Sequence, residues 1–324
     1  PDLADVAGQP QARRALEIAA AAGHNLLFSG PPGTGKTMLA SRINTLLPPL
    51  GEDASIEVAA IQSLAGKAVH AGNWRQRPFR SPHHTASAVA MVGGGSNPRP
   101  GEISLAHRGI LFLDELPEFD RKVLEVLREP LESGHITISR AAQQVEYPAQ
   151  FQLIAAMNPC PCGFYGDTRQ SCSCTAAQLQ RYSAKISGPL LDRIDLHVTV
   201  SRLPTEMLLQ SDAQPNAETS KIVSQRVEAA RRLQLCQRGK LSVALRTDEL
   251  IDGALIEAQA LEWLSMAIEK LGQSARSFHR VVRVARTIAD LEGNANSDKP
   301  AGTLQRVNVG HVKEALAFRQ LERK

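Results

Sequence analysis

Hydrophobic and polar positions have different periodicities in the two halves of the chain, and the pattern of the first half predicts strands. Three short apolar runs each end in polar residues: residues 25–28 lead into a glycine-rich stretch, "GILFL" ends at Asp114, and "QLIAAM" ends at Asn158. Runs of this kind are typical of buried strands in a parallel sheet. Residues 134–148 alternate apolar and polar side chains on both sides of a polar break, which predicts a β-hairpin.

The second half has apolar residues at helical spacing. The pattern predicts four helices, over residues 219–237, 256–271, 274–291 and 309–321, with Gly272 and Gly293 as stops. The polar, proline-bounded residues 203–216 between the halves predict a linker. We therefore expect an α/β domain with a parallel sheet over 1–202 and a small all-α lid domain over 217–324.

Three arginines of the third predicted helix recur at intervals of three residues. They are Arg280, Arg283 and Arg286. Such a row most often forms a solvated stripe on a helix surface, and we expect that here. Contact of one of them with phosphate or a neighbouring subunit is the alternative.

Composition narrows the class of protein. The chain has 324 residues, of which 43% are hydrophobic, so it can bury sizeable cores. No apolar run reaches the roughly 18 residues of a membrane span, and we expect a cytoplasmic protein. The chain begins at Pro1 without a methionine, so we expect an upstream part to be missing.

Charge is unevenly distributed. The net charge is only +4, but residues 66–108 carry six basic residues against the single acidic Glu102. Such a basic segment is typical of phosphate contact. A solvated loop with ordinary surface arginines explains the charge equally well.

The glycine-rich stretch after the first strand has the chemistry of a phosphate-binding loop. Residues 30–37 read Gly30-Pro31-Pro32-Gly33-Thr34-Gly35-Lys36-Thr37, between a predicted strand and a predicted helix. Glycines let backbone N–H groups wrap phosphate oxygens, and the helix directs its positive end toward them. Lys36 can reach the terminal phosphates, and the Thr37 hydroxyl can bind Mg²⁺. The sequence therefore predicts ATP and Mg²⁺ as ligands.

Polar residues at other predicted strand ends complete this site. Asp114 suits the Mg²⁺ shell, and Glu115 suits polarising the attacking water. The Asn158 amide can position that water or the γ-phosphate. Arg193 lies in "LLDRID" and has two interpretations: an ion-paired surface turn, or an arginine supplied across a subunit contact.

Four of the five cysteines gather in residues 158–175. Cys160, Cys162, Cys172 and Cys174 form two C-x-C pairs, which could close a tetrahedral Zn²⁺ site. The one-residue gap departs from the usual C-x₂₋₄-C spacing. Structural zinc and free thiols in a reducing cytoplasm stay open as alternatives, and both are favoured over disulfides.

In this order, these motifs resemble those of the AAA+ ATPases. The segment Val6-Ala7-Gly8-Gln9 resembles the part of that family that covers the adenine. The hairpin at 134–148 and the insertion at 66–108 resemble the subgroup with a helix-2 insert and a hairpin before the sensor strand. Longer stretches, including "FRSPHHTASAVAMVGGGSNPRPGEISLAHRG" and "AAMNPCPCG", resemble the bacterial ComM/YifB proteins, which are magnesium-chelatase-like. Members usually carry a further N-terminal domain.

The resemblance implies a hexameric ring that hydrolyses ATP at its subunit boundaries and moves along DNA. Such proteins are linked to branch migration on recombination intermediates in natural transformation, which implies single-stranded or branched DNA and recombination proteins as partners. Lys36, Thr37, Asp114, Glu115 and Asn158 fall on matching family positions. Arg193 falls on the arginine finger. Arg276 falls on the second sensor arginine.

A DNA contact is expected from the hairpin and the insertion together. Six hairpins projecting into a ring pore would place Arg140 against backbone phosphates, and the insertion would add Arg99, His83 and His84, with Gly93-Gly94-Gly95 for flexibility. A hairpin that only fills a subunit contact is one alternative. A magnesium-chelatase-like protein-remodelling motor and a slow ATP-switched DNA-binding protein are the other two.

Overall fold

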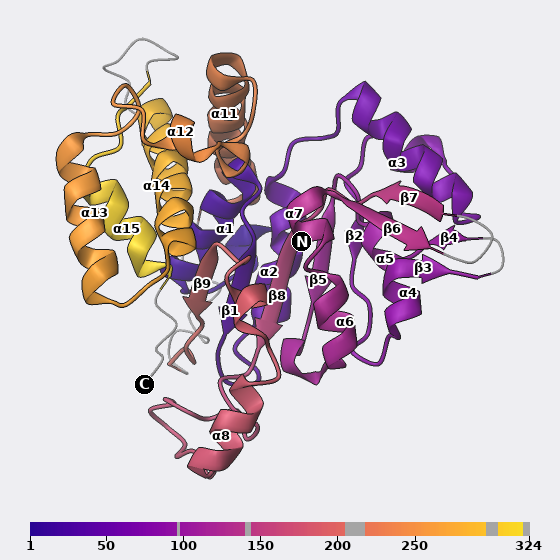
Figure 1. Ribbon diagram of the computed structural model, residues 1–324, viewed down its shortest axis with the longest axis horizontal. Helices are drawn as coiled ribbons and strands as arrows, with labels where there is room; N and C mark the ends of the chain where they lie inside the picture. The colour runs from indigo at the N-terminus through magenta and orange to yellow at the C-terminus, as the bar shows by residue number, and fades with distance from the viewer. Residues whose placement is uncertain (96–97, 140–143, 205–217, 296–303, 320–324) are drawn as a thin grey trace. The chain divides into compact units, whose positions relative to one another are not determined.

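The apolar runs of the first half become the central strands of one sheet (Figure 1). Its strands lie in the order β2 (Phe79–Arg80), β5 (Ile110–Leu113), β8 (Gln152–Met157), β1 (Leu26–Ser29) and β9 (Leu196–Thr199). Strands β2, β5 and β8 pair in parallel. Every residue of β1 and β5 is buried, as expected for strands enclosed on both faces.

The computed structural model describes residues 1–95, 98–139, 144–204, 218–295 and 304–319. The chain divides into two compact units. The first unit comprises Pro1–Leu26, Ser41–Leu47 and Ile194–Lys324, and the second comprises Leu27–Ala40 and Pro48–Arg193. Among the described residues, no helix combines the length and the apolar character needed to cross a bilayer.

The second unit holds most of the sheet and many short helices. Its helices are α2 (Lys36–Leu46, which continues into the first unit), α3 (Glu52–Leu64), α4 (Ala88–Val92), α5 (Glu102–Leu105), α6 (Arg121–Val126), α7 (Pro130–Ser133), α8 (Ala176–Ser183) and α9 (Gly188–Leu191), with 3-10 turns η2 (Ala71–Asn73) and η3 (Leu116–Glu118).

Two small antiparallel ladders complete the second unit. Strands β6 (His135–Ser139) and β7 (Gln144–Pro148) form the hairpin expected from the alternating pattern, with Ile136 opposite Tyr147. The hairpin tip, including Arg140, lies outside the described residues. Strands β3 (Gly93–Gly94) and β4 (Arg99–Pro100) form the other ladder. That the hairpin and residues 66–108 are insertions into a common core stays a prediction.

The first unit contains the predicted helices of the second half. They are α11 (Ser220–Arg238), α13 (Ala258–Lys270), α14 (Ala275–Ala295) and α15 (Val309–Ala317), joined by α1 (Pro10–Ala22), α12 (Thr247–Leu250), η1 (Leu3–Asp5) and η5 (Ser242–Ala244). Helix α14 packs against α1, α11 and α15. Its apolar residues Val281, Val284 and Ile288 are buried in this packing.

The expected solvated arginine stripe on α14 is wrong. Arg286 is 1% exposed and bonds the carboxylate of Asp290 in the next turn. Arg280 donates to Asp195 at 2.6 Å, and Arg283 donates to the Leu245 carbonyl. Because neighbouring elements surround α14, its polar face is enclosed, and carboxylates and carbonyls supply the partners that buried guanidinium groups require.

Candidate functional site

The loop between β1 and α2 takes the shape that its glycines allow. Gly33 and Gly35 have φ angles of 77° and 83°, which side chains with a Cβ rarely adopt. Thr34 closes the turn by donating its hydroxyl to the Pro31 carbonyl at 2.9 Å. The loop is tied to the sheet because the Gly30 amide donates to the Met157 carbonyl at 3.2 Å.

Lys36 lies inside this loop. Its ammonium donates to the carbonyls of Gly30 and Pro31 at 2.7 and 2.8 Å and to the Asn158 side chain at 3.2 Å. Burial lowers the pKa of Lys36, and the charges of Asp114 and Glu115 oppose that change. A buried ammonium held by neutral acceptors is suited to bind an anion, since phosphate oxygens can replace those carbonyls.

Thr37 and Asp114 meet across the loop. The Thr37 hydroxyl donates to Asp114 Oδ2 at 2.6 Å, and the backbone amide of Glu115 donates to Asp114 Oδ1 at 2.9 Å. Hydroxyl and carboxylate oxygens are the hard donors that Mg²⁺ prefers. The residues present thus fit a magnesium–nucleotide complex held by Lys36, Thr37 and Asp114.

Glu115 has an unexpected partner. His84 Nδ1 lies 3.2 Å from Glu115 Oε2, and the His84 ring stacks at 4.1 Å on His83, whose own Nδ1 lies 2.9 Å from the Thr85 hydroxyl. We expected His83 and His84 to contact DNA. No nearby sequence feature of either histidine indicates a contact with Glu115. Glu115 itself has a φ of 51°, a conformation uncommon outside glycine and typical of functional sites.

Asn158 lies at the end of β8 and is contacted from several elements. Besides Lys36, it contacts Tyr182 of α8, whose phenol oxygen takes a backbone hydrogen bond from Asn158. Burial is the main reason why the pKa of Tyr182 is raised. Thus Lys36, Thr37, Asp114 and Asn158 come together, as expected when parallel strands end at one edge of a sheet.

The two predicted arginine contributors have different surroundings. Arg193 is buried, donates to the Pro189 carbonyl at 2.7 Å and pairs with the carboxylate of Glu132. Arg276 is exposed near the start of α14. Their roles as arginine finger and second sensor stay predictions.

The predicted adenine segment lies in the first unit. Val6 is buried, and Gln9 donates its amide to the Ser201 carbonyl at 2.6 Å. Gly8 has a φ of 57°, and a Cβ there would lie 2.8 Å from the Leu203 side chain, so this position requires glycine. These contacts define a tight turn, and adenine binding by it stays a prediction.

Most arginines of the basic segment 66–108 bind the protein itself. Arg75 and Arg77 donate to the carbonyls of Leu50 and Pro48 at 2.8 Å each. Arg80 forms a two-pronged pair with Glu102 at 2.6 and 2.7 Å. Arg108 pairs with Glu57 at 2.8 Å. Burial, and next the charge of Arg108, lower the pKa of Arg77 to about 10.

These arginines therefore hold the fold of the segment, and a count of its charges overstates its basic surface. Arg99 differs from them because it is exposed on β4.

The β3–β4 ladder and the hairpin lie beside each other (Figure 1). The Tyr147 hydroxyl of β7 donates to the Pro98 carbonyl at 2.8 Å, and both residues are buried. A Cβ on Gly93 would overlap the Arg99 carbonyl oxygen and would lie 3.1 Å from Ile138 of β6. Gly93, expected to give flexibility, instead allows two backbones to approach closely.

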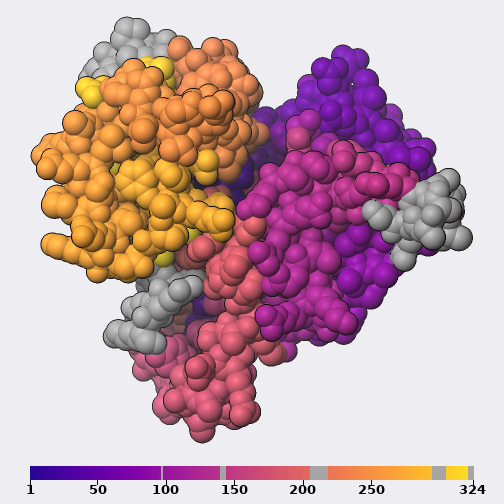
Figure 2. Space-filling view, viewed as in Figure 1, coloured from indigo at the N-terminus to yellow at the C-terminus, as the bar shows by residue number. Residues whose placement is uncertain are grey.

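The four clustered cysteines converge. Their sulfur atoms all lie within 4.8 Å of one another, and Cys160 is fully buried. The segment from these cysteines to α8 lies at the surface of the second unit, pink in Figure 2. Gly163, between the pairs, contacts the phosphate loop, because a Cβ there would lie 2.7 Å from Pro32 Cδ. This contact was not foreseen from the sequence.

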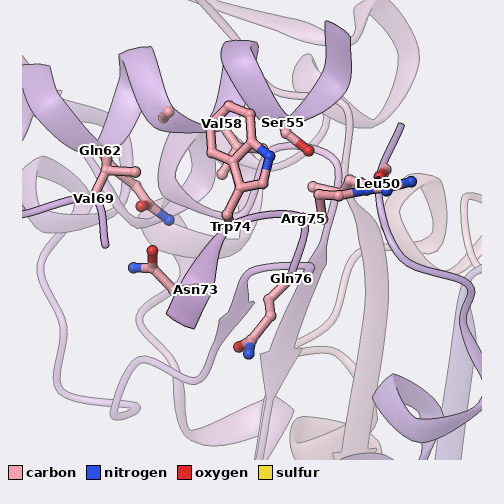
Figure 3. A pocket seen from close by; sticks show the side chains of 10 residues that line it. Leu50, Ser55, Val58, Gln62, Val69, Asn73, Trp74, Arg75 and Gln76 are labelled. Carbon is pink, nitrogen blue, oxygen red and sulfur yellow. Dashed lines mark hydrogen bonds between the residues drawn. The ribbon is translucent and has the colours of Figure 1, made fainter. Parts of the chain in front are cut away.

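A shallow pocket lies elsewhere in the second unit. Ser55, Val58 and Gln62 of α3 form one wall, and the Trp74 ring lies across it (Figure 3). The pocket contains none of the residues predicted to bind nucleotide. We assign it no role in the site.

The sequence matches two family models that together cover most of the chain. The model described as "Magnesium chelatase, subunit ChlI" matches residues 2–208, and the one described as "Magnesium chelatase, subunit ChlI C-terminal" matches residues 217–319.

Relatives matched over nearly the whole chain agree with this family assignment. The chain is 48% identical to the "Competence protein ComM" of Haemophilus influenzae and 50% identical to the "Uncharacterized protein YifB" of Escherichia coli, each over 99% of this chain. It spans 60–61% of the length of these two relatives. A more distant relative, the "Magnesium-chelatase subunit ChlI homolog" of Methanocaldococcus jannaschii, is 25% identical over 67% of this chain and 50% of its own length. This chain therefore belongs to the magnesium chelatase ChlI family, as a magnesium-chelatase-like AAA+ protein of the ComM/YifB kind.

Proposed function

We propose that this chain is the motor part of a hexameric, ATP-dependent DNA translocase that acts in branch migration during natural transformation. The ATPase part of this proposal rests on one observation: Lys36, Thr37, Asp114 and Asn158 converge around one phosphate loop. Bound Mg²⁺–ATP supplies the phosphoanhydride bond whose hydrolysis releases free energy. Lys36 binds the phosphates, Thr37 and Asp114 hold the metal, and Glu115 orients the attacking water.

Two features support DNA as the substrate. Arg99 is exposed on a ladder that is bonded to the hairpin through Tyr147 and Pro98, so the two predicted DNA elements pack against each other. The relative from H. influenzae is named a competence protein. The predicted contact Arg140 belongs to the same hairpin but lies outside the described residues.

The hairpin is also connected to the nucleotide site through the chain. Strand β7 ends at Pro148, β8 begins at Gln152, and β8 leads to Asn158 beside Lys36. A change at the phosphates that moves Asn158 therefore acts on the strand to which the hairpin is joined.

A second candidate is a protein-remodelling motor like magnesium chelatase. The family description and the M. jannaschii relative favour it. Both candidates use the same ATP site, so only the substrate separates them.

ATP turnover measured with and without DNA tests the proposal. Single-stranded and branched DNA should each raise turnover. Glu115→Gln should lower it by about 10²–10⁴-fold, the usual contribution of a residue that activates the nucleophile, and Lys36→Ala should abolish nucleotide binding. Glu118→Gln is the matched control, because Glu118 is an exposed neighbour paired with Lys185.

DNA affinity across salt concentrations separates the two candidates. Arg99→Glu should weaken DNA binding and reduce the salt slope by about one, as expected for a lost phosphate contact. Arg121→Glu, an exposed arginine on α6, should change neither. Turnover that DNA leaves unchanged, together with equal DNA affinity of the two variants, would contradict the DNA translocase and favour the protein-remodelling alternative.

A further inference from the structure

The cysteine cluster has the geometry of a mononuclear metal site. The sulfur of Cys160 lies 3.3 Å from that of Cys162 and 3.7 Å from that of Cys172, and the sulfurs of Cys162 and Cys172 are 3.5 Å apart. Cys174 completes the group within 4.8 Å. A tetrahedral Zn²⁺ with Zn–S bonds of about 2.3 Å separates its sulfurs by about 3.8 Å, close to these values.

The surroundings fit thiolate ligands. Backbone amides point at the sulfurs: Tyr165 donates to Cys160, Cys162 donates to Cys174, and Cys174 donates to Cys172, at 3.3–3.4 Å. Such N–H···S bonds spread the negative charge that four thiolates bring to one ion. The sulfurs are much farther apart than the roughly 2.05 Å of a disulfide, and all four cysteines are free.

We propose that Cys160, Cys162, Cys172 and Cys174 bind one Zn²⁺ and that this ion holds the segment after Asn158 against the phosphate loop. Each thiol releases its proton to solvent on binding, so four thiolates and one Zn²⁺ form a complex with a net charge of −2. No electron is transferred. The site is structural, because four protein ligands leave no open position.

The role at the phosphate loop follows from two neighbouring contacts. Cys160 is two residues from Asn158, which accepts a hydrogen bond from Lys36. Gly163, between the cysteine pairs, lies against Pro32 with no room for a Cβ. Closing the loop 160–174 on one ion therefore fixes a segment that contacts the phosphate loop at Pro32 and directly follows Asn158.

Metal content of the purified full chain tests the site. Elemental analysis should find one zinc per chain, and Cys160→Ser and Cys172→Ser should each lose it. Cys236→Ser is the control and should keep zinc, because Cys236 lies on α11 outside the cluster. Less than a tenth of a zinc per chain after expression in zinc-supplemented cells, or wild-type zinc content in both cluster variants, would overturn the proposal.

Cobalt substitution tests the metal site without any variant, so the test still works if the serine variants misfold. The unaltered chain refilled with Co²⁺ should show sulfur-to-cobalt charge-transfer bands and the strong visible absorption of a tetrahedral thiolate site. Octahedral cobalt absorption, or cysteines found as disulfides by mass analysis of the unreduced chain, would contradict four-thiolate coordination.

Hydrogen exchange tests the link to the phosphate loop. Chelator treatment should speed amide exchange in peptides covering residues 30–36 and 157–166, while α13 in the first unit stays unchanged. Equal protection in the first two peptides with and without zinc would overturn this link. Zinc removal should also lower ATP turnover by about 10–100-fold, and this expectation rests on the proposed function. Zinc content and hydrogen exchange do not depend on that function, so the zinc site and the proposed function can fail separately.

Discussion

Asp195 is a charged residue that is almost completely enclosed in the first unit. Its carboxylate receives Arg280 at 2.6 Å and the Asn25 amide at 3.0 Å, and His24 lies 3.6 Å away. Burial would raise the pKa of Asp195, but the nearby His24 ring and the charge of Arg280 hold that pKa well below its ordinary value. The carboxylate is therefore a structural anion at neutral pH.

The low pKa of Asp195 predicts a pH-dependent contribution to stability. A depressed folded-state pKa stabilises the fold above the unfolded pKa of about 3.9, and this contribution is lost as pH falls below that value. Asp195→Asn should lower the free energy of unfolding by about 3 kcal/mol at neutral pH, because it leaves Arg280 without its anion. Urea titrations at about pH 7 and about pH 3 should show a smaller pH dependence for the variant.

Asp248→Asn is the matched control for this measurement. Asp248 pairs with Arg246, but both side chains are mostly exposed, so the loss should be close to zero. Equal unfolding free energies of wild type and Asp195→Asn at both pH values would contradict the account of Asp195.

At the scale of elements, the β3–β4 ladder depends on Gly93. Its φ of 101° and the overlap of an added Cβ with the Arg99 carbonyl oxygen leave no place for a side chain. Gly93→Ala should therefore open the ladder that presents Arg99. We expect a loss of about 1–3 kcal/mol in stability from backbone strain and overpacking, together with weaker DNA binding.

Gly66→Ala separates strain from steric clash. Gly66 also has a positive φ, of 72°, but nothing lies within 4 Å of the added Cβ. DNA anisotropy should give this variant a DNA affinity near that of wild type. Urea unfolding should show only the smaller loss of stability that backbone strain causes. A Gly93→Ala chain that binds DNA as tightly as Gly66→Ala would show that the ladder does not position Arg99.

The local pattern was enough to predict the central strands, the hairpin and the long helices of the second half. Buried runs gave β1, β5 and β8, alternation gave β6 and β7, and helical spacing gave α11, α13, α14 and α15. These patterns depend on neighbours within a few residues, which the sequence displays directly. Among the described strands, β2, β3, β4 and β9 were missed: the first three span only two residues each, and β9 follows directly on the charged stretch 192–195.

What could not be predicted were partnerships between distant residues. His84 meets Glu115, Arg80 meets Glu102 and Gly163 meets Pro32, each across 22 or more positions of the chain. Charge and residue type alone do not say which side chains the fold will bring together. For the same reason the arginines of α14 were expected in solvent.

At the scale of the whole molecule, the proposed role of Arg193 as an arginine finger predicts an active site that two subunits share. Within its own chain Arg193 pairs with Glu132. This ion pair must open before Arg193 can contact the nucleotide of a neighbouring subunit. Lys36→Ala and Arg193→Ala chains should each be inactive alone and should recover ATP turnover when mixed. At mixed boundaries, the intact phosphate loop of one variant faces the intact arginine of the other.

Two controls complete the mixing experiment. Glu132→Ala should retain turnover, since it removes the internal pair but keeps the arginine. Thermal melting of Arg193→Ala should show a folded chain. Co-assembly seen by crosslinking without any recovery of turnover would show that Arg193 acts only within its own chain.

The position of β8 limits the kind of motion that can pass from the nucleotide to the hairpin. β8 has β5 along one edge and β1 along the other, and it is held to β5 in a parallel register from Ile110 opposite Gln152 to Leu113 opposite Ala155. Axial sliding by one residue would reverse the facing of every side chain in the strand. A slip of β8 by one residue would therefore be costly, so a motion proposed to reach the hairpin should tilt β8 and not slide it. Residues 149–151 join the hairpin to β8, so the proposed motor would pass such a tilt directly to the hairpin.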